Sequence, residues 1–204
     1  MAFYAVLLLY IDIMAERGYI RTRPPSARPA VLDAWDGTRR YQFDLLTAHV
    51  NERNEGQPRL PAPHGHDVYH IVLFTEGTNA FFLNGREFSS LPGTLALACP
   101  GQEHTFFPRR PGTTSYHEIT FALENNNEPL RTSIAALLSF YVGIDIEEAP
   151  LIIELTSGQY HAMGALYENL LDKLDQPEPT DWLGVYQTVL NILAFITGRI
   201  THTQ

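Results

Sequence analysis

The stretch from residue 64 to residue 112 constrains the fold more than any other part of this chain. Its first three histidines stand at even-numbered positions, so on one continuous strand they would project from the same face; they are His64, His66 and His70. Apolar residues continue that face, which is therefore expected to point into a core. Further along, Asn84-Gly85 separates two short apolar runs, and this dipeptide favours a type I′ hairpin turn. The stretch predicts antiparallel strands with histidines on an inward face.

Short strand-like runs separated by turn signals extend on both sides of this stretch. They are predicted at residues 30–35, 40–50, 66–76, 79–83, 86–90, 94–99, 103–108 and 115–123. Strands of this length and spacing suit a small antiparallel barrel or jelly roll. In the last run, the alternation places His117 on the apolar side, and Tyr116 and Glu118 on the side expected to face outward.

The periodicity of apolar residues lengthens to three and four after residue 125. Helices are predicted at 128–142, 157–175 and 180–200, with one short strand at 150–155. Gly143 is the expected C-cap of the first helix, and Ser157 the expected N-cap of the second. The apolar stripes of the last two helices are Met163, Leu166, Leu170 and Leu174, and then Trp182, Tyr186, Val189, Leu193 and Ile196. Two such helices have more apolar surface than a barrel needs to bury, which favours self-association.

The spacing of the histidines and glycines resembles the two conserved motifs of the cupin superfamily. The first motif reads here as His64, His66, His70 and Gly77, with a histidine where the family usually has glutamate. The second reads as Gly93, Cys99, Gly101, His104 and Pro108, with Cys99 in place of a proline and Pro108 in place of an asparagine. The motif pair covers about a quarter of the chain. The resemblance implies a mainly β fold, a cupin-type antiparallel β-barrel or jelly roll.

The helices that follow the predicted barrel extend the resemblance. A cupin barrel, a short helix, a proline-led strand and two amphipathic helices resemble the effector-binding domain of AraC-type transcription regulators, over roughly residues 40–200. The resemblance implies that the barrel binds a small-molecule effector and that the helices form a homodimer interface. A DNA-binding domain of two helix-turn-helix units normally follows in that family, and no such pattern is present here. We expect either a fragment of a longer regulator or a stand-alone sensor.

Three segments are expected from this order of elements. They are an N-terminal arm at residues 1–29, the barrel at residues 30–125 and the helical extension at residues 126–204. Proline and arginine are concentrated at residues 18–30, which are expected to form an extended connector.

The cupin resemblance implies that four imidazoles converge inside the barrel. They are those of His64, His66, His70 and His104. Neutral imidazole suits a divalent transition metal such as Zn²⁺, Ni²⁺ or Fe²⁺, so a metal site is predicted. The alternative is a metal-free pocket in which the histidines are hydrogen-bonded polar residues.

Four further residues are predicted to line the ligand pocket: His117, Phe82, Phe106 and Cys99. One phenylalanine of each adjacent pair in the hairpin region must face inward, although ordinary core packing is the alternative role. For His117 the alternative is a satisfied core histidine. Cys99 stands beside the predicted site, and its alternative role is that of a buried, inert thiol.

Composition narrows the possible partners. The net charge of −9 and the pI of about 5.3 give a surface that repels nucleic-acid phosphates, so this chain alone is not expected to bind DNA. A single cysteine excludes an intrachain disulfide and fits a reducing, cytoplasmic compartment. The apolar run at residues 3–11 is too short to span a membrane. No phosphate-binding loop or dinucleotide-binding glycine motif is present, so no organic cofactor is expected.

Three functions fit these observations. The first is a non-enzymatic sensor that binds a small molecule and changes a dimer through its helices. The second is a metal-dependent cupin enzyme, an oxygenase or isomerase that acts on a small polar substrate. The third is a stand-alone cupin that stores a metal or ligand. The helices favour the first, because simple metal cupins rarely carry two long amphipathic helices after the barrel, and the histidine set favours the second.

Overall fold

A computed structural model of the chain describes residues 31–35, 40–47, 62–77, 80–106, 114–125, 128–143, 145, 146, 149, 151–174 and 182–201. The predicted arm at residues 1–29, Pro108 and the side chains of Leu174 and Trp182 lie outside this description. The strands are β1 (Val31–Trp35), β2 (Arg40–Thr47), β3 (Tyr69–Glu76), β4 (Ala80–Leu83), β5 (Arg86–Ser89), β6 (Thr94–Ala98), β7 (His104–Thr105), β8 (Ser115–Asn125), β9 (Glu128–Pro129) and β10 (Ile152–Glu154). The helices are α2 (Ile134–Val142), α3 (Ser157–Leu174) and α4 (Trp182–Thr201).

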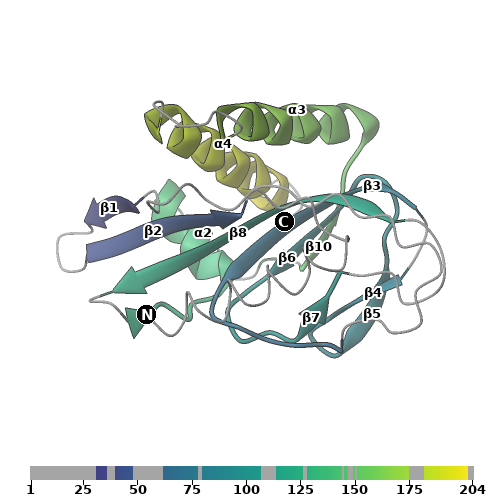
Figure 1. Ribbon diagram of the computed structural model, residues 1–204, viewed down its shortest axis with the longest axis horizontal. Coiled ribbons are helices and arrows are strands. Elements are labelled where there is room, and N and C mark those ends of the chain that lie inside the picture. The colour runs from purple at the N-terminus through teal and green to yellow at the C-terminus, as the bar shows by residue number, and fades with distance from the viewer. Residues whose placement is uncertain are drawn as a thin grey trace.

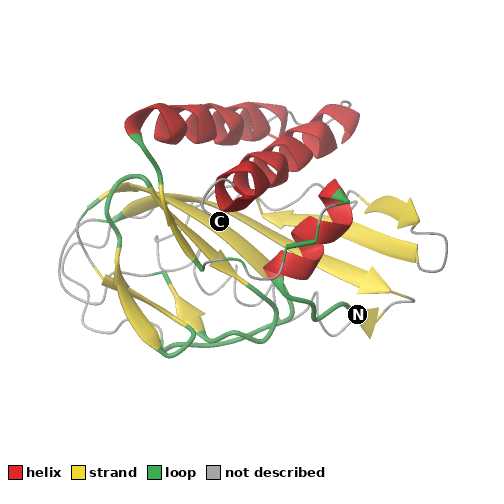
Figure 2. Cartoon of the chain, turned by 180° about the vertical axis from the view of Figure 1, so that it is seen from behind, coloured by secondary structure: helices red, strands yellow, loops and turns green. Residues whose placement is uncertain are grey.

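These strands form two antiparallel sheets. The large sheet has the order β1-β2-β8-β3-β6-β10, with β9 paired to β8, and the small sheet has the order β5-β4-β7. Helices α3 and α4 lie over one face of the large sheet, and the small sheet lies on its other side (Figures 1 and 2). Within the described residues the pairing makes a sandwich of two sheets, not a closed barrel. The predicted fold class, an antiparallel cupin-type β fold followed by helices, is confirmed in this form.

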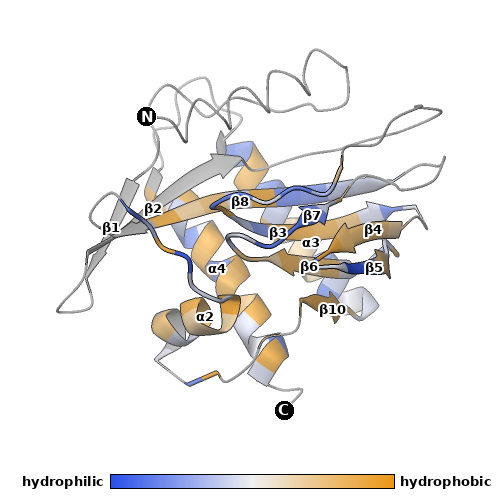
Figure 3. Cartoon of the chain, turned by 90° about the horizontal axis from the view of Figure 1, so that it is seen from below, coloured by the Kyte–Doolittle hydropathy of each residue, from blue (hydrophilic) through white to orange (hydrophobic). Residues whose placement is uncertain are grey.

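The central strand β3 is buried on both faces, which explains its nearly continuous apolar sequence. Odd-numbered residues of β3, such as Ile71, belong to the core cluster shared with the helices. Even-numbered Val72 and Phe74 pack instead with Phe81 and Phe106 on the side of the small sheet. The hydropathy colouring in Figure 3 shows apolar residues on β3, β6 and the neighbouring helices. The strand therefore separates an apolar helix-side core from a second interior that faces the small sheet.

Two tyrosines tie the helical segment to β3. The hydroxyl of Tyr167 on α3 donates to the carbonyl oxygen of Ile71 at 2.6 Å. From β3 itself, the hydroxyl of Tyr69 donates to the carbonyl oxygen of Thr132 at 3.0 Å, and the Tyr69 ring stacks on Phe121 of β8 with centroids 4.9 Å apart. Both phenols thereby find a hydrogen-bond acceptor inside the apolar core.

The predicted turn and the predicted C-cap are confirmed. Asn84 and Gly85 have φ angles of 49° and 79° and join β4 to β5, as a type I′ turn requires. Gly143 follows α2 with φ of 67°, and its amide donates to the carbonyl of Ser139.

Several predicted boundaries differ from the structure. Strand β3 begins at Tyr69, so His66 precedes it, and residues 128–129 pair with β8 as β9 where a helix was predicted. The helix starts only at Ile134, where the side chain of Ser133 accepts the Ala136 amide. At α3 the cap is Thr156, not Ser157. Its Oγ1 accepts the Gln159 amide at 3.4 Å while Gln159 Oε1 accepts the Thr156 amide at 2.9 Å, a reciprocal capping box.

The apolar stripe of α4 lies mostly inside this single chain. Val189, Leu193 and Ile196 are at most 1% exposed and belong to the helix-side core. The sequence alone could not separate this intrachain contact from a dimer contact, because both need the same stripe. Two large apolar residues of α4 are exposed, Leu183 at 79% and Leu190 at 39%.

Helix α4 also meets the length and hydropathy expected of a membrane-spanning helix. The segment Leu183–Thr201 has a mean hydropathy of 1.3, and half of its apolar window is buried inside the chain. A core helix passes the same test, so this composition is weak evidence for a membrane span.

Candidate metal centre

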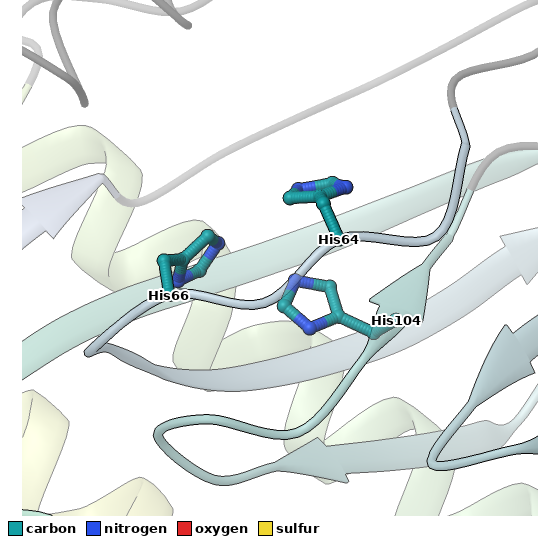
Figure 4. Close-up of side chains that lie close together, drawn as sticks. All are labelled: His64, His66 and His104. Atoms are coloured by element: carbon teal, nitrogen blue, oxygen red, sulfur yellow. The ribbon is translucent and has the colours of Figure 1, made fainter.

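Three histidine rings from two chain segments meet at the edge of the interior that faces the small sheet. His64 forms an isolated antiparallel bridge with His104, the first residue of β7, through backbone bonds of 3.1 and 2.9 Å. His66 follows two residues after His64 on the segment that leads into β3. Figure 4 shows the three side chains gathered on this part of the fold.

The spacing of the three rings fits a shared metal ion. Each of His64, His66 and His104 offers one ring nitrogen, and these atoms all lie within 4.8 Å of one another. Nitrogen ligands of one ion at a bond length of ~2.0–2.1 Å stand roughly 3–4 Å apart, so a small inward movement would bring all three into contact with it.

Backbone carbonyls fix which ring nitrogen carries the hydrogen in two of these histidines. His104 Nδ1 lies 2.9 Å from the carbonyl oxygen of Gln102, and His64 Nδ1 lies 3.3 Å from that of Ala62. A carbonyl only accepts, so in both contacts Nδ1 carries the hydrogen and Nε2 keeps its lone pair. This is the arrangement in which second-shell carbonyls hold a metal-binding histidine.

The fourth predicted ligand, His70 on β3, stands just outside this group of three. Its Nε2 lies 3.1 Å from His66 Nε2, and its Nδ1 contacts Oε1 of Glu118. His66 Nδ1 is buried and has no hydrogen-bond partner among the described residues. No hydrogen bond to Nδ1 therefore fixes the tautomer of His66, so its Nε2 can offer a lone pair to a cation that it shares with the neighbouring imidazoles.

Burial keeps these rings neutral, the form that binds a metal. Desolvation is the largest cause in each case: it lowers the pKa of His66 to about 2, that of His70 to about 3 and that of His104 to about 3. The neighbouring imidazoles lower these pKa values further by mutual repulsion of the charged forms. Burial also raises the pKa of Glu118 to about 7.

Of the predicted pocket residues, only Phe106 lies against the histidines. Its ring stacks on His104 with centroids 5.2 Å apart. Phe81, not Phe82, is the buried member of its pair on β4, because Phe82 lies on the opposite and partly exposed face of that strand.

Cys99 and His117 lie on the helix side of the large sheet, so the prediction that they line the histidine pocket is wrong. The Cys99 sulfur accepts the backbone amide of Ile134 at 3.2 Å, and burial raises the pKa of its thiol. The ring of His117 stacks on Tyr167 of α3, with centroids 5.5 Å apart. Both residues are adjacent in sequence to pocket-facing residues. Because successive side chains along a strand alternate, Cys99 and His117 point to the opposite face of the sheet.

The sequence analysis missed Glu118 and Tyr116, which were expected to face outward. Glu118 is 8% exposed, and Tyr116 is 2% exposed and packs on Phe74 and Phe106. Strand β8 pairs with β3 so that Val72 opposes Glu118, which puts their shared face toward the histidines. The sequence signal is the alternation along residues 115–123, which places Tyr116 and Glu118 on one face and His117 on the other but does not show that both faces are covered.

Residues 52–136 match the sequence profile of the AraC-like ligand binding domain. No curated protein matches the chain in sequence. Among solved structures, the chain is similar to the AraC-like transcriptional activator CuxR at 12% identity and a TM-score of 0.40, over 92% of this chain and 63% of that one. It is also similar to salicylate 1,2-dioxygenase from Pseudoaminobacter salicylatoxidans at 13% identity and a TM-score of 0.31, over 86% of this chain and 54% of that one. The chain therefore spans less than two thirds of either protein.

Proposed function

We propose that this chain, whose residues 52–136 match the profile of the AraC-like ligand binding domain, is the small-molecule-sensing part of an AraC-type transcription regulator and acts in the cytoplasm. The family match carries this proposal. The fold supports it, because a ligand held at the histidines would touch β3, and the opposite face of β3 packs on the helices. A shift of β3 caused by ligand binding would therefore change its contacts with the helical segment.

We further propose that the pocket holds one divalent transition metal. His64, His66 and His104 would be its ligands, since one ring nitrogen of each lies within 4.8 Å of the others, and carbonyl oxygens at Nδ1 of His64 and His104 place the ring hydrogen on that nitrogen. A bound ion would add a positive centre that attracts an anionic or oxygen-bearing effector. Phe106, stacked on His104, would form an apolar wall beside it.

Protein purified without chelator is expected to contain about one transition-metal ion per chain, as a single three-histidine site implies. Changing both His66 and His104 to alanine removes two of the three close ligands and should abolish that content. The measurement is elemental analysis before and after addition of stoichiometric Zn²⁺ or Ni²⁺. His161→Ala is the matched control, since His161 is an exposed residue of α3. A wild-type chain that takes up neither metal would refute the metal site.

The alternative function is a metal-dependent oxygenase or isomerase. One observation favours it: three close imidazole ligands leave coordination positions open, as catalytic metal sites do. We propose the sensor instead because of the family match.

A sensor is expected to bind a small molecule without converting it. In a panel of small diols, keto acids and sugars, a true effector should raise the melting temperature of the metal-loaded protein, because a ligand that binds only the folded state stabilises it. Chromatography after incubation in air should recover that compound unchanged. A reproducible product that disappears in the His104→Ala variant would instead assign the protein to the enzyme class.

We also propose that the chain forms a homodimer through its helical segment. The residues available for that contact are the exposed ones on α4, Leu183 and Leu190, together with Phe140 on α2, which is 39% exposed. Large apolar side chains left in water by a single chain are candidates for burial against a second copy.

A further inference from the structure

Glu118 is a buried carboxyl group whose position is not explained by packing. It lies on β8, is 8% exposed, and its Oε1 contacts Nδ1 of His70 on the neighbouring strand β3. In the sheet register His70 opposes Thr120, and Glu118 stands two residues further along, so the contact runs diagonally between the two strands. Burying a carboxyl group is costly unless a partner uses it. Its partner here is a ring of the histidine cluster.

The tautomer of His70 decides whether it can bind a metal. For Nε2 to offer a lone pair to an ion, the ring hydrogen must sit on Nδ1, and a buried Nδ1–H needs an acceptor. Glu118 Oε1 occupies that position. Backbone carbonyls of Gln102 and Ala62 hold His104 and His64 by the same nitrogen. Glu118 therefore does for His70, with a side chain, what the backbone does for the other two rings.

The free nitrogen of His70 also lies where a ligand is needed. His70 Nε2 and His66 Nε2 are 3.1 Å apart. Two nitrogens bound at ~2.0–2.1 Å to one ion with near-tetrahedral or octahedral angles stand about 3 Å apart, so a single ion could accept both. With both lone pairs directed at this gap, the two rings repel each other unless a proton or a cation lies between them.

We propose that Glu118 is a positioning residue that fixes His70 as the fourth nitrogen ligand of the cluster, a carboxylate–histidine–metal arrangement assembled from β8 and β3. The inference rests on the proposed metal site and deepens it. In the cupin-like motif of this chain the carboxylate position is occupied by His70 itself. Glu118 supplies a carboxylate from a different strand, and this carboxylate contacts the ligand His70 instead of the ion itself.

The test compares Zn²⁺ affinity, by competition with a chromophoric chelator, and the visible spectrum of the Co²⁺-substituted protein. Glu118→Leu keeps most of the side-chain volume but removes the acceptor, and is expected to weaken Zn²⁺ binding about 10–100-fold, the usual effect of losing a second-shell carboxylate. Its Co²⁺ spectrum should change toward that of His70→Ala, because both lose the fourth nitrogen. Glu118→Gln keeps an oxygen that can accept from Nδ1–H and should restore most of the affinity and the spectrum.

The double variant Glu118→Leu with His70→Ala separates positioning from general damage. If Glu118 acts through His70, its loss should add nothing once His70 is absent. Unchanged affinity and spectrum in Glu118→Leu, or a loss that adds fully to that of His70→Ala, would overturn the inference while leaving the three-histidine site intact. If Glu118→Leu does not fold, as judged by circular dichroism, Glu118→Gln decides: wild-type affinity and spectrum support the inference, and a 10–100-fold loss contradicts it. A wild-type chain without Zn²⁺ or Co²⁺ binding would overturn this inference and the metal site together.

Discussion

Replacing Leu193 with glutamate is expected to destabilise this chain severely. Leu193 is 1% exposed and belongs to the cluster that joins α4 to the large sheet. The substitution removes a buried apolar side chain and places an unpaired carboxylate in that core, a combination that costs about 4–5 kcal/mol or more. Domains of this size have only about 5–15 kcal/mol of stability, so the variant would lose roughly a third of it or more. Urea unfolding followed by circular dichroism measures the effect.

Leu190→Glu on the same helix is the matched control. Leu190 is 39% exposed, so a glutamate there stays hydrated, and the free energy of unfolding should change by less than about 0.5 kcal/mol. If α4 contributes to a homodimer, as proposed, light scattering should find this variant folded and monomeric at concentrations where the wild type is dimeric. A Leu193→Glu variant with the free energy of unfolding of the wild type would contradict the burial of this stripe against the chain's own sheet.

The metal-free protein is expected to be less stable at pH 5 than at pH 7 because of its buried histidines. Burial lowers the folded-state pKa of His66, His70 and His104 to about 2–3. Below pH ~6.5 the unfolded chain therefore binds protons that the folded chain excludes, and stability falls as the pH falls. Each of these histidines lowers the free energy of unfolding by roughly 2 kcal/mol between pH 7 and pH 5.

Glu118 acts in the opposite direction over an overlapping range. Its folded-state pKa is raised from 4.5 to about 7, so between those values the folded chain binds the extra proton and acidification stabilises it. Protonation of Glu118 raises the free energy of unfolding by roughly 2 kcal/mol between pH 7 and pH 5. The three histidines and Glu118 together therefore lower the free energy of unfolding by about 2–4 kcal/mol. Urea titrations at the two pH values in the presence of a chelator measure it. Removing one imidazole in His66→Gln should reduce the loss by about 2 kcal/mol, and equal stability at both pH values would contradict the assignment of neutral buried rings.

The sequence by itself determined the local structure and the residues that share a face. Asn84-Gly85 fixes the β4–β5 hairpin because that dipeptide tolerates two positive φ angles, and Gly143 ends α2 for the same reason. The motif spacing also identified three histidines, His64, His66 and His104, that the fold brings together. These features depend on a few consecutive residues or on a motif carried by one sheet edge, so no distant contact was needed to predict them.

Only the tertiary structure decided which face of each strand holds the site. Alternation along β8 shows that Glu118 and His117 point in opposite directions, but the apolar row next to His117 was interpreted as the pocket side. That row packs on the helices, while Glu118 meets His70 in the second interior. The same ambiguity affected Cys99 and the stripe around Leu193. A strand or helix buried on more than one side carries the same hydrophobic pattern whichever partner covers it, because burial is set by contacts between segments far apart in sequence.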